Sequence, residues 1–229
     1  MLQMDFSFFN VESIRGFTST FVIILSATLY PFGFLFRSKR PPLDILKYFV
    51  TTLRNQDKKV AFIRIDEDWA LARSSELMRK YYNMNIIVQT TGGDTSSING
   101  KSEIPNNTLA NIMRALLMKS SHKKELWCFA YQYAIWLSRR TDNRFRGYVP
   151  YFIWHGIILS YKHIKIWGMI VYIINGLATR KNLMTDHTKV ILWNMQILKR
   201  VILCWEPDQP FIIHRSHHFW LMNILLASP

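Results

Sequence analysis

Three acidic residues stand at positions where carboxylates could hold metal ions. Asp5 lies inside a short aromatic run near the start of the chain, Asp66 follows the apolar run 60–65, and Glu103 falls at the start of an expected helix. Carboxylates are hard oxygen ligands for Mg²⁺ or Mn²⁺, and phosphoryl transfer often uses several of them, from different elements, to hold two ions. The three positions therefore predict a two-ion pocket at the edge of a sheet.

Each acid alone has an ordinary structural explanation. Asp66 could cap the segment that follows it, and Glu103 could complement the dipole of its helix. Asp68 stands two residues after Asp66 and competes with it for the second position. The metal-site interpretation therefore depends on the three acids acting together.

The elements that must position these acids begin with a predicted three-stranded meander. Residues 4–10 form a short aromatic strand, and 17–36 contain two strand-like runs joined by a turn at Pro31-Phe32-Gly33. A helix is expected next, because apolar residues follow at helical spacing, namely Leu43, Leu46, Phe49, Val50 and Leu53.

The rest of the first part alternates between predicted strands and helices. Apolar runs predict strands at 60–65 and 86–88, and the Gly- and Ser-rich stretch 90–101 predicts a loop. Helical periodicity predicts helices at 75–82, 102–119 and 124–139. The fold class is thus expected to be α/β, with a mixed five-stranded sheet flanked by helices.

The last part of the chain has a different pattern. Arginines gather at 139–146, which indicates a boundary between a core, 1–143, and a remaining region, 144–229. There, "VILCW" and "FIIHR" flank the turn-like "EPDQP". We expect a linker and a small β-rich C-terminal module.

The charge balance indicates a polyanionic partner. Lys and Arg number 29 against 15 Asp and Glu, a formal net charge of +14, so nucleic acid or an anionic membrane surface should be attracted. Basic turns and amide side chains are candidates for contacts to DNA phosphates or bases. The candidates are Arg37, Lys39, Arg40, Arg139, Arg140, Arg144, Arg146, Asn99, Asn106 and Asn107.

A membrane anchor is the alternative interpretation for residues 17–36. The segment carries no charge and is flanked by Arg15 and the basic cluster 37–40, which suits a spanning helix. Its many β-branched and aromatic residues favour two strands instead. Two cysteines outside any CxxC pair indicate free thiols in a reducing compartment, so we expect a location in the nucleus or cytoplasm.

An ordered series of segments resembles the integrase of Copia-type LTR retrotransposons. The family belongs to the D,D,E superfamily of transposases and retroviral integrases, which has a ribonuclease-H-like core. "MDFSFF", "FIRIDED" and "NIIVQTTGGDTSSINGKSE" are similar to the segments that carry the three acids. "NNTLANIMRALL", "LWCFAYQYAIWLSRR" and "GYVPYFIWHG" with "YKHIKIWGMIVYI" are similar to segments that follow, so the resemblance extends over nearly the whole chain.

The resemblance implies a catalytic triad of Asp5, Asp66 and Glu103. The interval 67–102 is close in length to the one that names the superfamily. It further implies two Mg²⁺ or Mn²⁺ ions, DNA ends and target DNA as partners, homo-oligomers, and no small-molecule substrate. The implied reaction is metal-dependent DNA strand transfer, without a covalent enzyme intermediate.

Several positions depart from the family pattern. Trp69 stands where a glycine is usual, Ile104 and Asn107 replace arginines, and Leu25 replaces an acid at the end of the second strand. The zinc-binding module that usually precedes this core is absent from the sequence. These departures indicate a degenerate or truncated copy, and they leave a catalytically inactive nucleic-acid-binding remnant as the alternative function.

Overall fold

The fold is known from a computed structural model, which describes residues 1–38, 43–66, 75–91, 96–142, 147–159, 161, 164, 166–174, 187–196, 201–206 and 209–215. Its first part consists of β1 (Leu2–Phe8), β2 (Ser19–Leu25), β3 (Tyr30–Phe36), α1 (Leu43–Asn55), β4 (Phe62–Asp66), α2 (Ser75–Asn83), β5 (Ile87–Thr91), α3 (Ser96–Ser120), a short 3-10 helix (Lys124–Leu126) and α4 (Trp127–Ser138). Its second part consists of α5 (Pro150–His155), β6 (Ile170–Ile174), β7 (His187–Gln196), β8 (Val201–Glu206) and β9 (Gln209–Arg215).

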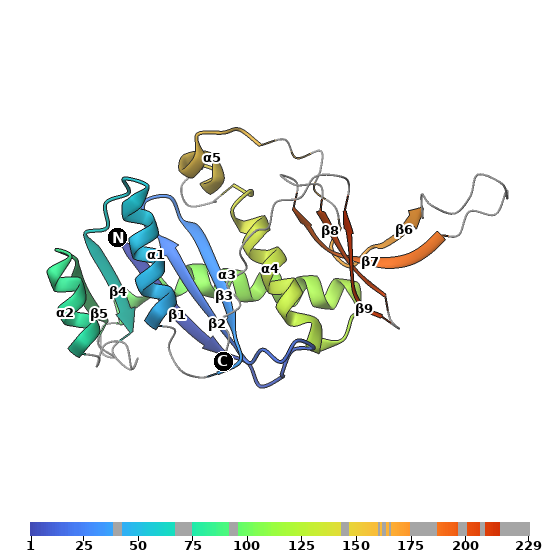
Figure 1. The fold of residues 1–229 in the computed structure, drawn as a ribbon, viewed down its shortest axis with the longest axis horizontal. Helices are drawn as coiled ribbons and strands as arrows, with labels where there is room; N and C mark the ends of the chain where they lie inside the picture. The colour runs from blue at the N-terminus through green and yellow to red at the C-terminus, as the bar shows by residue number, and fades with distance from the viewer. Residues whose placement is uncertain are drawn as a thin grey trace.

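The first five strands form one mixed sheet in the order β3-β2-β1-β4-β5. β1, β2 and β3 are an antiparallel meander, and β4 joins both β1 and β5 in parallel. Figure 1 shows α1 in front of this sheet and α3 passing behind it. The predicted fold class, α/β with a mixed five-stranded sheet flanked by helices, is confirmed.

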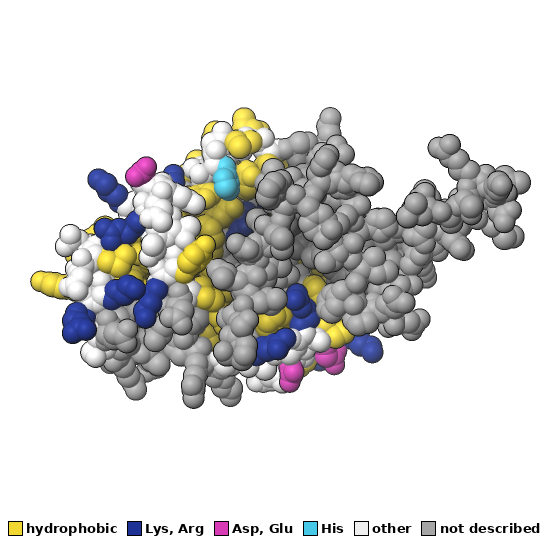
Figure 2. Space-filling model, in the orientation of Figure 1, with side chains coloured by type: hydrophobic (Ala, Val, Ile, Leu, Met, Phe, Trp, Pro, Cys, Tyr) yellow, Lys and Arg dark blue, Asp and Glu magenta, His cyan; other side chains and the backbone are white. Residues whose placement is uncertain are grey.

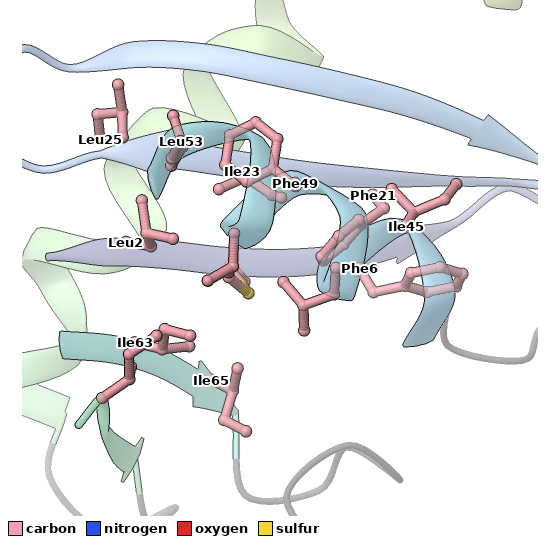
Figure 3. Close-up of a cluster of buried hydrophobic side chains, with 14 of the residues drawn as sticks. Leu2, Phe6, Phe21, Ile23, Leu25, Ile45, Phe49, Leu53, Ile63 and Ile65 are labelled. Carbon is pink, nitrogen blue, oxygen red and sulfur yellow. The ribbon is translucent and has the colours of Figure 1, made fainter. Parts of the chain in front are cut away.

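Two apolar clusters bury the two faces of the sheet. The first packs α1 and α2 against the strands and includes Phe6, Phe21, Leu46 and Tyr81, and Figure 3 shows its strand residues gathered beneath α1. The second packs α3 and α4 against the opposite face. Helices therefore cover both faces of the sheet over β2, as is usual where strands are joined by helical crossovers.

The meander explains why residues 17–36 look like a membrane span. Every residue of β2 is buried, because Phe21 and Ile23 enter the first cluster while Val22 and Ile24 enter the second. A strand covered on both faces must be apolar throughout. The alternative of a spanning helix at 17–36 is therefore wrong, and no helix within the described residues is long and apolar enough to cross a bilayer.

The turn of this meander lies earlier than predicted. It occupies residues 26–29, where Leu29 has a φ of 53° and donates its N–H to the Leu25 carbonyl at 2.7 Å. Pro31 and Gly33 lie inside β3 instead. Proline is tolerated there because β3 is an edge strand of the sheet.

Gly33 lets α4 approach the sheet closely. A Cβ atom at this position would clash with Ile135 Cδ1 and come within 3.1 Å of Tyr131 Cε1. Glycine at a strand centre often marks such a close backbone approach. Gly33, which indicated a turn in the sequence, is therefore needed for the packing of α4 against β3.

The predicted helix after the meander is confirmed as α1. Its buried residues include Leu46, Phe49, Val50 and Leu53, which are expected from the helical spacing, and the side chain of Leu43 lies outside the described set. The chain leaves the helix through Asp57, which has a φ of 56°, and Lys58 donates its N–H to the Leu53 carbonyl at 2.9 Å. This reversal satisfies a carbonyl of the last turn.

α3 begins at Ser96, within the predicted loop 90–101. Glu103 and Pro105 consequently lie inside the helix rather than in its first turn, so that part of the prediction is wrong. The proline removes one backbone N–H from the helical ladder. Leu109 and Met113, further along, anchor α3 in the second cluster.

The C-terminal strands form a separate antiparallel sheet in the order β6-β7-β8-β9. β8 and β9 contain "VILCW" and "FIIHR", so the expected β-rich character holds for the described part of the region. α5 belongs to the first core, because Tyr151 is buried in the first cluster. The division at 143/144 stays a prediction.

Candidate functional site

Asp5 lies on the face of β1 opposite α1. Side chains alternate along a strand, and Leu2, Met4 and Phe6 all enter the first cluster beneath α1. Asp5 is half-buried on the other face, and its Oδ1 accepts the N–H of Phe6 at 2.7 Å. One carboxylate oxygen is thereby engaged, and the group is held at the strand.

The register of the sheet brings the position of Asp66 toward Asp5. β1 and β4 run parallel, with Leu2 opposite Ile63 and Gln3 opposite Arg64. Continued along both strands, the same offset places position 66 level with position 5. Asp66 is the last residue of β4 and pairs with Thr91 of β5. The two acids thus belong to neighbouring strands, each two residues beyond the last recorded pair, Gln3 and Arg64.

Glu103 belongs to α3, the helix on the same side of the sheet as Asp5. Leu109 and Met113 of α3 share the second cluster with Val22 and Ile24 of β2, and Figure 1 shows the helix running behind the strands. The backbone therefore places Asp5 on β1, Asp66 at the end of β4 and Glu103 on α3, the helix that packs on the face of the sheet carrying Asp5. The side chains of Asp66 and Glu103 are outside the described part of the structure, as is Asp68.

The described side chains contain no group of three or more His, Cys, Asp and Glu residues that could hold a metal ion. Of the three predicted acids, Asp5 is the one whose side chain the structure describes. The donor chemistry of the triad, three carboxylates, fits Mg²⁺ or Mn²⁺.

Tyr131 and Thr20 are neighbours of Asp5 that the sequence did not reveal as site residues. The hydroxyl of Tyr131 is buried. Burial raises the pKa of this phenol, a contact with Thr20 opposes the shift, and the charge of Asp5 raises the pKa further. Tyr131 consequently stays protonated and gives Asp5 a neutral neighbour. The four-residue spacing of Trp127, Tyr131 and Ile135 on α4 is the sequence signal that indicates that Tyr131 faces the sheet.

Two of the predicted DNA-contacting residues near the meander and on α3, Arg37 and Asn107, have described side chains, and both are exposed. Arg37 is exposed, with its guanidinium 5.9 Å from the centre of the Phe17 ring. Asn107 is exposed on α3. Asn99 and Asn106 lie in α3 with side chains that are not described, and Lys39, Arg40, Arg144 and Arg146 lie outside the described residues.

Arg139 and Arg140 are part of the core packing. Arg139 donates from Nε to the Pro31 carbonyl at 2.8 Å and lies 4.7 Å from the centre of the Tyr30 ring. Arg140 is 7% exposed, and its guanidinium lies 4.3 Å from the ring centre of Trp136. The contacts of Arg139 join the end of α4 to β3, whereas Arg140 packs on Trp136 of α4 and lies 5.0 Å from the ring centre of Tyr151 on α5. Their placement argues against phosphate contacts, and we leave both out of the proposed DNA surface.

Burial lowers the pKa of both guanidinium groups. Nearby Tyr30 and Tyr151 oppose the shift, and both arginines remain charged at neutral pH. Tyr30 of β3 and Tyr151 of α5 are partners from other elements, so the run of arginines alone does not indicate this structural role.

Comparison with solved structures finds retroviral integrases. The catalytic core domain of BIV integrase has 15% sequence identity and a TM-score of 0.45, covering 66% of this chain and 91% of that chain. The HTLV-2 integrase catalytic core domain, in complex with magnesium, has 14% identity and a TM-score of 0.49, covering 67% of this chain and 95% of that chain.

A simian T-cell lymphotropic virus intasome, in complex with PP2A regulatory subunit B56 gamma, has 12% identity and a TM-score of 0.49, covering 93% of this chain and 77% of that chain. No protein-family model matches the sequence, and no curated protein matches it. Similarity at this level concerns the fold alone, so the function has to be argued from the residues of this chain.

Proposed function

We propose that this protein is an integrase-like, nucleic-acid-binding protein that carries out metal-dependent DNA strand transfer. The observation that supports the proposal is the parallel pairing of β1 with β4, in which Leu2 lies opposite Ile63 and Gln3 opposite Arg64, together with the packing of α3, the helix that contains Glu103, on the face of the sheet that carries Asp5. A net charge of +14 favours a polyanionic substrate. The resemblance to Copia-type integrases in the acid-bearing segments supports the same reaction.

In this proposal Asp5, Asp66 and Glu103 hold two Mg²⁺ or Mn²⁺ ions. Bound ions of this kind activate a water or a DNA 3′ hydroxyl and stabilise the leaving oxygen. The chain itself supplies orientation: the backbone N–H of Phe6 holds one oxygen of Asp5, and protonated Tyr131 adds no competing charge. DNA ends and target DNA are the proposed partners, homo-oligomers the proposed assembly, and nucleus or cytoplasm the proposed location.

The test is a strand-transfer assay with the purified full chain, a labelled DNA duplex, and Mg²⁺ or Mn²⁺. We expect nicked or joined products that disappear with EDTA and in Asp66→Asn, because an amide is a weaker ligand for a hard cation. Asp57→Asn is the matched control, since Asp57 is an exposed acid beyond the end of α1. Equal loss of product in Asp57→Asn would contradict the assignment.

Asp68→Asn separates the two candidates for the second acid. If Asp66 is the ligand, Asp68→Asn retains product formation while Asp66→Asn loses it. The reverse result would move the second ligand to Asp68. Both variants must bind DNA in EDTA as the wild type does, so that loss of product reports on the metal site.

A second candidate function, a nucleic-acid-binding remnant without catalysis, is favoured by Leu25. The family pattern has an acid there, whereas Leu25 is 8% exposed within the first cluster. DNA binding with no metal-dependent product from the wild-type chain would support this candidate.

A further inference from the structure

Basic side chains gather on the outer surface of α1 and α2. Figure 2 shows Lys and Arg residues spread over these two helices. We call this the α1/α2 surface and define it by five exposed residues: Arg54, Lys58, Lys59, Arg79 and Lys80. Among the side chains described there, Asp57 is the exposed acid. The exposed charged side chains described on this surface therefore carry a net positive charge, and the side chains of Asp44 and Glu76 lie outside the described set.

The packing of the two helices places this charge on one side of the molecule. Leu46 and Phe49 of α1 and Tyr81 of α2 all enter the first cluster, so both helices cover the same face of the sheet. Asp5 lies on the other face. The α1/α2 surface is thus separated from the candidate acids by the sheet itself.

Helix stability accounts for only part of this charge. Arg54 and Lys80 lie in the last turns of α1 and α2, where a cation complements the helix dipole. Lys58 and Lys59 come after the end of α1, and five like charges on neighbouring elements repel one another. A polyanion laid across them would relieve that repulsion.

We propose that the α1/α2 surface binds nucleic acid through its phosphates, as a second contact surface on the side of the sheet opposite Asp5. The proposal rests on the proposed function only for the nature of the partner. Tyr82, 80% exposed beside Arg79 and Lys80 in the sequence, adds an aromatic ring that can pack on a sugar or base.

The exposed aromatic residues favour nucleic acid over an anionic membrane. A helix that lies in a membrane surface inserts an apolar face, but the apolar faces of α1 and α2 are occupied by the core. Among the side chains described on these two helices, the exposed large hydrophobic ones are Tyr48 and Tyr82, which carry hydroxyl groups.

The experiment measures binding of the full chain to a labelled DNA duplex in EDTA over a series of salt concentrations. The variant is Arg54→Gln, Lys59→Gln, Arg79→Gln and Lys80→Gln combined. Lys58 is retained because its amino group lies 5.0 Å from the Trp154 ring centre. The control combines Arg114→Gln, Lys119→Gln, Lys123→Gln and Lys124→Gln, exposed residues on and just after α3, with the same change in net charge.

The slope of log K against log salt decreases in magnitude by roughly 0.9 for each phosphate that the protein no longer neutralises. We expect the α1/α2 variant to lower the magnitude of the slope by about 2 to 4, and the control by about 1 or less. Equal slopes for the two variants would overturn the proposal, because total charge alone would then explain binding.

Vesicles with anionic lipid provide the second arm of the experiment. Binding to vesicles that is stronger than binding to DNA, and that the same four substitutions abolish, would also overturn the proposal. Neither measurement requires a metal ion or a strand-transfer reaction. Failure of strand transfer therefore leaves this result intact, and equal slopes leave the strand-transfer proposal intact.

Discussion

On β1, Leu2, Met4 and Phe6 are buried beneath α1, whereas Asp5 and Ser7 are half-buried on the face that α3 and α4 cover. One strand thus contributes apolar area to one face and polar groups to the other. In β1, strand alternation thus separates the side chains that stabilise the fold from the candidate metal ligand. Adjacent residues of β1 should consequently respond very differently to substitution.

The largest expected contrast is between Phe6→Ala and Asp5→Asn. Phe6 is 8% exposed and its ring centre lies 6.3 Å from that of Phe21, so truncation should lower the free energy of unfolding by about 3–5 kcal/mol. Asp5→Asn retains the oxygen that accepts the Phe6 N–H, so the change should stay below about 1 kcal/mol. Chemical denaturation in EDTA measures both.

Activity should show the opposite order. Asp5→Asn is expected to remove the metal-dependent product, while Phe6→Ala should retain it at temperatures where the variant is folded. A large loss of stability in Asp5→Asn would break the comparison, because Asp5 would then be a structural residue.

Gly33→Ala tests the packing of α4 on the second face. The added methyl group would clash with Ile135 Cδ1, and overpacking of this kind should destabilise the fold by about 1–3 kcal/mol. A shift of the thermal unfolding midpoint measures the effect. Combining it with Ile135→Val, which shortens the clashing side chain, should restore part of the loss. No recovery in the double variant would mean that the strain lies in the backbone of β3.

Much of the sheet was predictable because it depends on local pattern. The apolar runs before Asp66 and at β5, and the helical spacing of Leu46, Phe49 and Val50, are visible in short windows of sequence. The order of strands and helices followed from them. The pairing of β1 with β4, which puts Asp5 and Asp66 on neighbouring strands, is non-local and is not contained in those windows.

The errors arise where tertiary contacts override local signals. Pro31 and Gly33 are turn residues by local rules, yet an edge position tolerates the first and the approach of α4 requires the second. Arg139 and Arg140 look like a solvated basic run, but Tyr30 and Tyr151 supply aromatic partners from other elements. Nothing within the run itself indicates those partners.

The smallest expected effect concerns pH and α5. His155 Nε2 lies 3.3 Å from the Tyr30 hydroxyl, which donates to it when the ring is neutral. Partial burial, followed by the charges of Arg139, Arg140 and Lys58, lowers the pKa of His155 below its usual 6.5. The unfolded chain therefore binds a proton more readily than the folded one.

This contribution to stability is complete above about pH 6.5 and is lost as the pH falls through the lowered pKa of His155. His155→Gln should make the free energy of unfolding less dependent on pH in this range. Tyr30→Phe should keep most of that dependence, because the charges of Arg139, Arg140 and Lys58 remain. The effect is small because His155 is exposed and solvent screens the repulsion. Denaturation profiles between neutral and mildly acidic pH measure it. If His155→Gln and the wild type lose stability in parallel, His155 is not the titrating group, and other histidines or acids set the acid limit of the fold.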